Sequence, residues 1–185
     1  AEKEKEEAEK RGINVYDLLT SKASTAPIGS TELFLLPYFE GSGTPTFNRK
    51  ARGVFLGLTL AHSKKEVIRA ILEGLTYELR NNIEAMEEHG TEITELRAIG
   101  GGAKSKFWLQ LKADIAKRRV VVPNVTEAAA LGAAILASAG AKIYEKTEEA
   151  VGAIYREKEA FTPNTETGIV YEKYYQLYKK LYGTF

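Results

Sequence analysis

The residues best placed to do chemistry are three consecutive glycines, Gly100, Gly101 and Gly102, in the stretch IGGGAKSKFWLQLKAD from Ile99 to Asp114. A short apolar run precedes them and an amphipathic stretch follows. Backbone without side chains lets N–H groups approach a phosphate closely, and the start of a helix adds the positive end of its dipole. The pattern therefore predicts an anion site, with phosphate as its ligand.

A glycine turn can also be a simple connector, so the turn alone leaves both interpretations open. The stretch has neither the GxxxxGK of a Walker A loop nor the GxGxxG of a dinucleotide fold, which excludes these two phosphate sites. If the turn binds phosphate, we expect Gly102 to be the critical position, because it has no Cβ and can adopt a positive φ.

Among the residues that follow the glycines, four side chains could have a role in the site or in the core. Lys104 and Lys106 could attract phosphate by charge, or be the solvated lysines that are common at helix starts. Asp114 lies several helical turns further on, so we expect it to fix neighbouring backbone rather than to touch phosphate. Trp108 is expected to be a core anchor whose indole N–H needs a partner.

Metal chemistry has little support. The chain has no cysteine, which excludes disulfides and thiolate ligands and is compatible with a reducing compartment. Only His62 and His89 could supply imidazole, and they fall at opposite ends of one predicted helix. We expect no metal site and two solvated histidines.

Length and composition indicate an ordinary globular protein. The chain has 185 residues, of which 44% are hydrophobic and 28% charged, enough for one domain with a core. Its 26 basic and 25 acidic side chains give a net charge of +1, so the overall electrostatic field of the protein does not favour binding to nucleic acid. No apolar run is long enough for a membrane span, and the charged start AEKEKEEAEK does not resemble a signal peptide. We expect a cytoplasmic protein.

The elements that must position the glycine turn alternate between strands and helices, which predicts an α/β fold with a partly parallel sheet. Predicted strands cover residues 33–39, 52–60, 96–99 and 119–122, and predicted helices cover 1–19, 63–89, 105–115, 126–139, 147–159 and 165–181. Ligands of such sheets bind beyond the carboxyl ends of the strands, where the three glycines fall. We expect residues 1–30 to form a polar helix and loop, 31–140 the α/β core that holds the glycine turn, and 141–185 the C-terminal helices.

Three helices have specific signals. Ser63 and Glu66 form a capping box for a long core helix that ends at Gly90. The helix over 126–139 consists almost wholly of Ala, Leu, Gly and Ile, so its backbone could lie close to a neighbour. Six residues are expected to anchor the last helix: Tyr171, Tyr174, Tyr175, Leu177, Tyr178 and Leu181.

Four motifs together resemble one family. GGGAKSxxWxQxxAD resembles the adenosine-binding signature in the C-terminal domain of the FGGY carbohydrate kinases. The segment from Gly53 to Gly74 resembles their second signature, whose positions are filled here by Gly53, Phe55, Gly57, Leu58, Glu66, Val67, Ala70 and Glu73. The loop from Pro37 to Gly53 and the Ala-rich helix from Glu127 to Ala137 resemble their counterparts in the same order.

The resemblance implies an actin-like ATPase fold of ribonuclease H type, as the C-terminal portion of a two-domain sugar kinase. It implies that Gly100, Gly101 and Gly102 meet the phosphates of ATP, used with Mg²⁺, and that Ala103, Ser105 and Lys106 border the adenine. Glycerol kinase has an Asn near Ser105 or Lys106, and the absence of Asn here departs from that pattern. The loop GSGTP favours the xylulokinase-like branch, and hence a ketose such as xylulose, over other sugars and polyols.

In this family the sugar-binding domain, the catalytic Asp and the loops that hold the β- and γ-phosphates precede the segment that corresponds to Ala1. The resemblance therefore implies no catalytic residue within this chain, and an inactive chain in isolation. The alternative is a non-catalytic actin-like module for nucleotide binding or interaction. An open apolar edge along LFLLPYF, residues 33–39, would also favour a homodimer.

Overall fold

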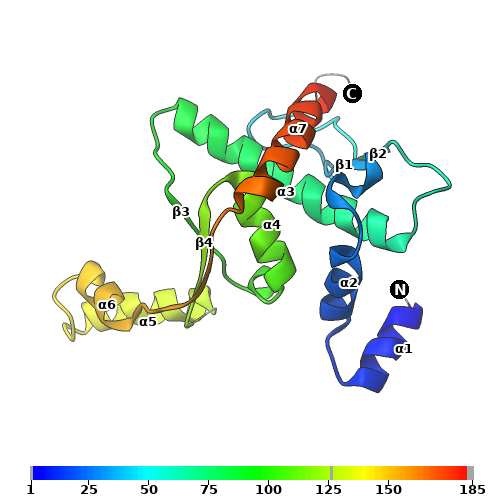
Figure 1. Ribbon diagram of the computed structural model, residues 1–185. Coiled ribbons are helices and arrows are strands. Elements are labelled where there is room, and N and C mark those ends of the chain that lie inside the picture. Colours follow the sequence, from blue (N-terminus) through cyan, green and yellow to red (C-terminus); the bar gives the residue numbers. More distant parts are fainter. Residues whose placement is uncertain (1, 126, 183–185) are drawn as a thin grey trace.

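The computed structural model describes residues 2–125 and 127–182 (Figure 1). Its helices are α1 (Glu2–Arg11), α2 (Val15–Ser24), α3 (Lys64–Glu88), α4 (Lys106–Ala116), α5 (Ala128–Gly140), α6 (Thr147–Ile154) and α7 (Thr165–Tyr182), with the short 3₁₀ turns η1 (Ile28–Thr31) and η2 (Gly101–Ala103). Its strands are β1 (Phe34–Leu36), β2 (Val54–Leu56), β3 (Glu95–Arg97), β4 (Arg119–Pro123) and β5 (Glu157–Phe161). Among these described residues, no helix is both long and apolar enough to cross a membrane.

The strands form two small sheets. In the sheet β3–β4–β5, β3 and β4 are parallel, with Leu96 opposite Val120, and β5 is antiparallel to β4. The connection from β3 to β4 passes through η2 and α4, whose Leu109 and Ala113 pack on Val120 in a buried cluster. This confirms the predicted alternation of strand, glycine turn, helix and parallel strand.

Helix α3 is the longest element, and both of its predicted end signals are confirmed. The backbone N–H and the hydroxyl of Ser63 both donate to the carboxylate of Glu66, at 2.9 and 2.7 Å, as part of a capping box. The helix ends just before Gly90, which has a φ of 87°. Helices α4 and α7 pack on α3, and α7 crosses it steeply in Figure 1.

Tyrosines fill the contact between α3 and α7. The ring of Tyr77 lies 6.4, 6.2 and 5.2 Å from the rings of Tyr171, Tyr175 and Tyr178, measured between centroids, and all four are buried. Tyr171, Tyr175 and Tyr178 are therefore confirmed as anchors of the last helix, whereas their partner Tyr77 was not predicted. Leu177 was wrongly expected among them, because its side chain points to solvent and is 47% exposed.

The predicted N-terminal helix is in fact two helices. The chain turns at Gly12, which has a φ of 63°, and Asn14 then caps α2 by accepting the N–H of Tyr16 at 2.8 Å. Helix α2 continues to Ser24, through residues predicted to form a loop. Glu4 of α1 is buried beside Lys64, whose amine donates to it at 2.7 Å and holds its pKa down to about 2.

The run LFLLPYF is less open than predicted. Its strand β1 is antiparallel to β2, and Leu35 and Leu36 are buried. The carbonyl oxygen of Leu35 lies 2.4 Å from where a Cβ on Gly74 of α3 would be, so α3 and β1 approach as closely as glycine allows. Most of the run therefore packs against α3, and Phe39 at its end is the side chain of the run that is strongly exposed, at 65%.

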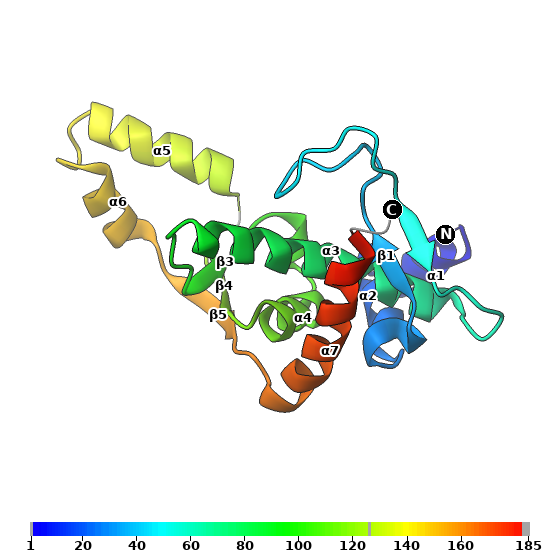
Figure 2. The same ribbon diagram turned by 90° about the horizontal axis from the view of Figure 1, so that it is seen from above.

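The last third of the chain differs most from the prediction. The helix predicted over 147–159 ends at Ile154, and the strand β5 follows where helix was expected. Helix α5 has no buried residue, and a Cβ added to Gly132 would meet no atom within 4 Å, so no described segment approaches the helix at that point as closely as predicted. Figures 1 and 2 show α5 and α6 projecting from the other helices. The predicted start of α5, at Thr126, lies outside the described residues.

Candidate functional site

The glycine turn leads from the carboxyl end of β3 into α4. Gly100 leaves the strand with a φ of 68°, and its carbonyl accepts the N–H of Ala103 at 3.1 Å to form η2. The hydroxyl of Ser105 then accepts the N–H of Trp108 at 3.3 Å, which confirms Ser105 as the cap of α4. The positive end of the α4 dipole therefore lies at the turn.

The three glycines are not equivalent. A Cβ added to Gly100 or Gly101 would meet no atom within 4 Å, so their backbone is open to a ligand. A Cβ on Gly102 would lie 3.4 Å from Cζ3 of Trp108 and 3.5 Å from Nζ of Lys112. The positive φ expected at Gly102 belongs to Gly100 instead. A Cβ on Gly102 would thus make only ordinary van der Waals contacts, and Gly101 is the glycine that combines open space with a φ outside the positive region.

A cavity of about 390 Å³ opens between the turn and α2. Its walls come from three elements: Asn14, Tyr16, Asp17 and Thr20 at α2, Leu72 of α3, and Gly101, Gly102, Lys104, Ser105 and Trp108 from the turn and α4. Two of these side chains are charged, the cation Lys104 at the turn and the anion Asp17 on the α2 wall. Trp108 and Leu72 supply apolar surface between the charged groups.

The predicted site residues separate into two groups. Gly101, Gly102 and Ser105 line the cavity, and Gly100 begins the turn. Ala103 is instead buried in the cluster between α4 and the sheet. Lys106 turns toward β5, where its amine pairs with Glu159 at 2.6 Å.

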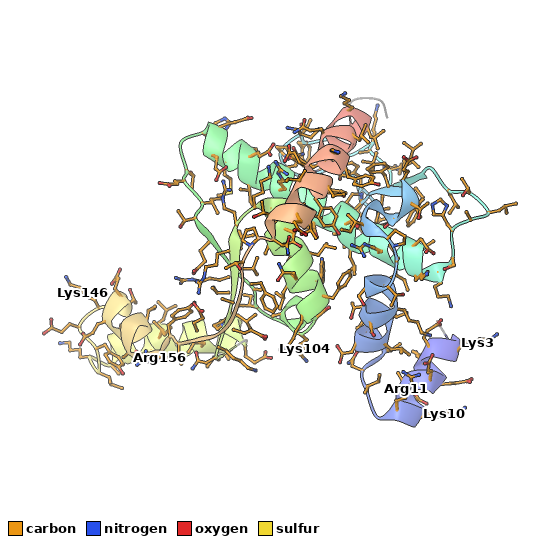
Figure 3. The ribbon with its side chains drawn as sticks, in the orientation of Figure 1. Lys3, Lys10, Arg11, Lys104, Lys146 and Arg156 are labelled. Atoms are coloured by element: carbon orange, nitrogen blue, oxygen red, sulfur yellow. The ribbon has the colours of Figure 1, made fainter. Side chains whose placement is uncertain are left out.

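Positive charge lies on both sides of the turn. Lys104 is exposed, and Figure 3 shows it at the turn, far from the basic residues labelled on α1 and beside α6. Lys112 is half-buried, with its amine 4.0 Å over the ring of Trp108, and burial lowers the pKa of that amine. An anion bound at the turn would be attracted by both lysines.

The other two expectations from the motif are confirmed. Asp114 accepts the backbone N–H of Asn164 at 2.8 Å and the hydroxyl of Thr167 at 2.9 Å, so it holds the start of α7. The indole N–H of Trp108 donates to the hydroxyl of Thr76 at 3.2 Å. Trp108 is only half-buried and lines the cavity, however, so it is more than a core anchor.

The α2 wall was not predicted from the sequence. Asn14, Tyr16, Asp17 and Thr20 lie in a stretch that was interpreted mainly as a solvent-facing helix, and Tyr16 is indeed 72% exposed. One signal was present: Asn14, followed by Asp17 in the first turn, is a typical helix start. It would have located α2, although not the cavity that α2 borders.

The histidines lie apart from this cavity. The Nε2 atom of His62 lies 3.0 Å from the carbonyl oxygen of Thr31, and the Nδ1 atom of His89 lies 2.8 Å from that of Ala85. Within residues 2–125 and 127–182, no three or more His, Cys, Asp or Glu side chains gather in a way that could hold a metal ion.

Comparisons with known proteins give a consistent result. Residues 1–141 match the C-terminal domain of the FGGY family of carbohydrate kinases. The chain is 38% identical to a xylulose kinase of Staphylococcus epidermidis over 90% of its own length and 34% of the relative's. It is also 38% identical to a gluconokinase of Bacillus subtilis, over 84% of this chain and 31% of that protein.

A solved structure supports the same assignment. The crystal structure of a ligand-bound xylulose kinase from Lactobacillus acidophilus superposes with a TM-score of 0.83 at 29% identity, covering 94% of this chain and 35% of that one. The chain thus spans about a third of the relatives it matches. The predicted fold class, a mixed α/β domain consistent with the actin-like ATPase C-terminal domain, is confirmed by this likeness. The chain belongs to the FGGY family of carbohydrate kinases and corresponds to their C-terminal domain.

Proposed function

We propose that this chain is the nucleotide-binding part of an ATP-dependent carbohydrate kinase, which transfers the γ-phosphoryl group of ATP to a hydroxyl of a sugar or polyol. The observation that carries the proposal is the cavity between α2 and the glycine turn, at the carboxyl end of a parallel strand. Family membership supplies the reaction class. It favours a kinase over the alternative of a non-catalytic nucleotide-binding module.

The residues of the cavity suit a nucleotide. The open backbone of Gly101 and the start of α4 offer N–H groups to phosphate, with Lys104 beside them. Trp108 and Leu72 offer apolar surface to a base, and Asp17 and Thr20 on the opposite wall offer polar groups to ribose hydroxyls. Gly100 and Gly102 shape the turn, and Ser105 caps the helix.

The structure qualifies the adenine contacts that the resemblance implied. Ala103 is buried in the core and Lys106 pairs with Glu159, so neither side chain faces the cavity. The Asn that glycerol kinase has near this point therefore has no counterpart among the lining side chains at the start of α4. We assign the base to the surface of Trp108 and Leu72 instead.

Magnesium is not held by this chain alone in our proposal. Asp17 is the one carboxylate among the residues that line the cavity. Mg²⁺ usually keeps several waters and is bound through carboxylates together with substrate phosphates. The remaining contacts to the Mg²⁺ of MgATP are expected from parts of the kinase that this chain does not span, given that it covers 34% of the xylulose kinase.

Catalysis is assigned to the same uncovered parts. Phosphoryl transfer depends on positioning the γ-phosphoryl group, neutralising its charge and accepting the hydroxyl proton. We assign no catalytic residue to this chain and expect it to be inactive alone. A cytoplasmic location, a homodimer and the absence of nucleic-acid or membrane partners also belong to the proposal.

The identity of the sugar substrate is proposed from the names of the relatives. Relatives named xylulose kinase, gluconokinase and ribulokinase match the chain at 38%, 38% and 35% identity, so identity alone does not separate them. We favour a ketose such as xylulose, because four of the relatives and several of the solved structures are named xylulose kinases.

A titration with MgADP tests the nucleotide site directly. Trp108 is the one tryptophan of the chain and lines the cavity, so its fluorescence should respond to a bound nucleotide. We expect Gly101→Val to weaken the affinity for MgADP about tenfold or more, because its side chain would occupy the phosphate position. Gly132→Val is the matched control, since Gly132 is equally open but lies on α5.

Two results would contradict the proposal. One is a wild-type chain whose fluorescence shows no saturable response to MgADP. The other is a Gly101→Val variant that is folded by circular dichroism and binds MgADP as tightly as the Gly132→Val variant does. In the second case the glycine turn would be only a connector.

A further inference from the structure

One face of α3 forms the base of the cavity. Arg69, Leu72, Glu73 and Thr76 occupy positions i, i+3, i+4 and i+7 and therefore lie on the same side of the helix. Leu72 lines the cavity itself. The other three are polar but buried, with exposed fractions of 5% for Arg69 and 1% each for Glu73 and Thr76.

Arg69 and Thr76 connect the two walls of the cavity. The guanidinium of Arg69 donates to the carbonyl oxygen of Ala26, just beyond the end of α2, at 2.5 Å. It also lies 5.3 Å from the centroid of the Phe107 ring, in the first turn of α4. Thr76 accepts the indole N–H of Trp108 at 3.2 Å. The distance between α2 and the turn is therefore set on this face of α3.

Glu73 holds Arg69 in that position. Its carboxylate accepts the Nε–H of Arg69 at 2.8 Å, and the hydroxyls of Ser30 and Tyr171 at 2.7 and 3.0 Å. It also accepts the backbone N–H of Gly29 at 3.0 Å. A buried carboxylate with four donors is fully satisfied, so it fixes each donor in place.

Two of those donors belong to a strained loop. Gly29, Ser30, Thr31 and Glu32 have consecutive φ values of 74°, 51°, 57° and 63°, a conformation that residues with a side chain adopt at a cost. Residues 25–28 connect the end of α2 to this loop. If its hydrogen bonds to Glu73 were lost, it could relax and shift α2.

We propose that Arg69 and Glu73 are positioning residues for the nucleotide, which hold α2 at the distance from the glycine turn that lets both walls contact one ligand. The inference rests on the proposed function, because it assigns the cavity to a nucleotide. It goes further in linking affinity to an ion pair that touches no part of the ligand.

Arg80 provides a matched control. It is another buried arginine of α3, also paired with a glutamate four residues on, Glu84, at 3.0 Å. Its other partners are Glu172 at 2.9 Å and the carbonyl oxygen of Ile115 at 3.2 Å, so it connects α3 to α7 and to the far end of α4. Neither wall of the cavity depends on it directly.

The experiment measures thermal midpoint and MgADP affinity for Arg69→Lys, Glu73→Gln and Arg80→Lys, with affinity taken from the fluorescence midpoint of Trp108 well below unfolding. All three variants should unfold at lower temperature. Arg69→Lys and Glu73→Gln should also bind MgADP about tenfold more weakly, whereas Arg80→Lys should bind like the wild type. If Glu73→Gln does not fold, Ser30→Ala removes one hydrogen bond instead and should weaken binding about threefold.

The results distinguish a failure of the proposed function from a failure of this inference. A wild-type chain without saturable MgADP binding overturns the proposed function, and this inference with it. A wild-type chain that binds, with Arg69 and Ser30 variants that bind equally well, overturns the inference alone. Equal losses of affinity in the Arg69 and Arg80 variants also overturn it, because the effect would then follow from general destabilisation.

Discussion

Helices α4 and α5 both lie in segments that resemble motifs of the family, but they differ in how much of their surface is buried. Helix α4 is amphipathic and buries six of its residues: Leu109, Leu111, Ala113, Asp114, Ile115 and Ala116. Helix α5 is apolar almost throughout, yet it buries none. It contacts α6 and projects from the body of the chain (Figure 2). Apolar composition alone therefore does not indicate which helix forms the core.

The difference follows from what each helix has to pack against. Helix α4 connects two parallel strands, so it must lie on the sheet they form, and α3 and α7 cover its other side. Helix α5 comes after β4 in the chain, and α6 then connects it to β5, which pairs with β4. An apolar helix in that place would gain from burial, which the described residues of this chain do not provide.

The largest difference is expected between two leucine-to-alanine substitutions, one in each helix. Leu109→Ala in α4 should lower the free energy of unfolding by about 2–5 kcal/mol, because Leu109 is 1% exposed and its loss leaves a cavity. Leu136→Ala in α5 should change it by less than about 0.5 kcal/mol, since Leu136 is 66% exposed. Urea unfolding followed by circular dichroism measures both. Equal losses would mean that α5 is packed in solution.

A smaller effect is expected at the polar contacts of the two helices. Asp114→Ala should cost about 1–3 kcal/mol, because the N–H of Asn164 and the hydroxyl of Thr167 would lose their acceptor. Glu127→Ala is the comparison, since Glu127 precedes α5 and makes no side-chain hydrogen bond as its cap. Its thermal midpoint should stay close to that of the wild type. A larger shift for Glu127→Ala than for Asp114→Ala would reverse the comparison.

The smallest expected effect is a dependence of stability on pH that arises from Glu172 of α7. Burial tends to raise the pKa of Glu172, but hydrogen bonds from Lys117, Gln176 and Arg80 outweigh it and lower the pKa to about 2. A carboxyl whose pKa is lowered on folding stabilises the fold above its unfolded value near 4.5, and that stability is lost as the pH falls toward 2.

We therefore expect a loss of about 1–2 kcal/mol from this group between pH 5 and pH 2, after allowing for solvent screening. The measurement is the free energy of unfolding across that range. Glu172→Gln should be less stable at neutral pH and should show a flatter profile. An unchanged profile would show that the ion pairs of α7 with Lys117 and Arg80 contribute little.

Much of the fold could be predicted where local rules and tertiary contacts agree. The capping box at Ser63, the stop at Gly90 and the cap at Ser105 are each decided within a few residues, and all are confirmed. The glycine turn could be located for the same reason. Which glycine has the positive φ could not be predicted, because three consecutive glycines carry no side chain that would distinguish them.

Where local sequence rules and tertiary contacts disagree, the prediction was wrong. The strand β5, with the sequence EKEAF, has the charged residues of a solvated helix and was predicted as the end of one. It is a strand because the edge of β4 offers hydrogen bonds to it, and because Arg119 pairs with Glu157 at 2.6 Å. Propensity cannot foresee a partner strand that lies more than thirty residues earlier.

The sequence by itself determined the family, the α/β class, the long helix α3 and the glycine turn at the start of α4, because each depends on residues that are neighbours along the chain. Only the tertiary structure decided that α2 faces this turn across a cavity, and that Arg69, held by Glu73, and Thr76 connect the two walls. Arg69 and Tyr171, which share a hydrogen bond of 2.6 Å, are separated by most of the chain. Contacts of that kind form only when packing brings distant segments together, so no local pattern encodes them.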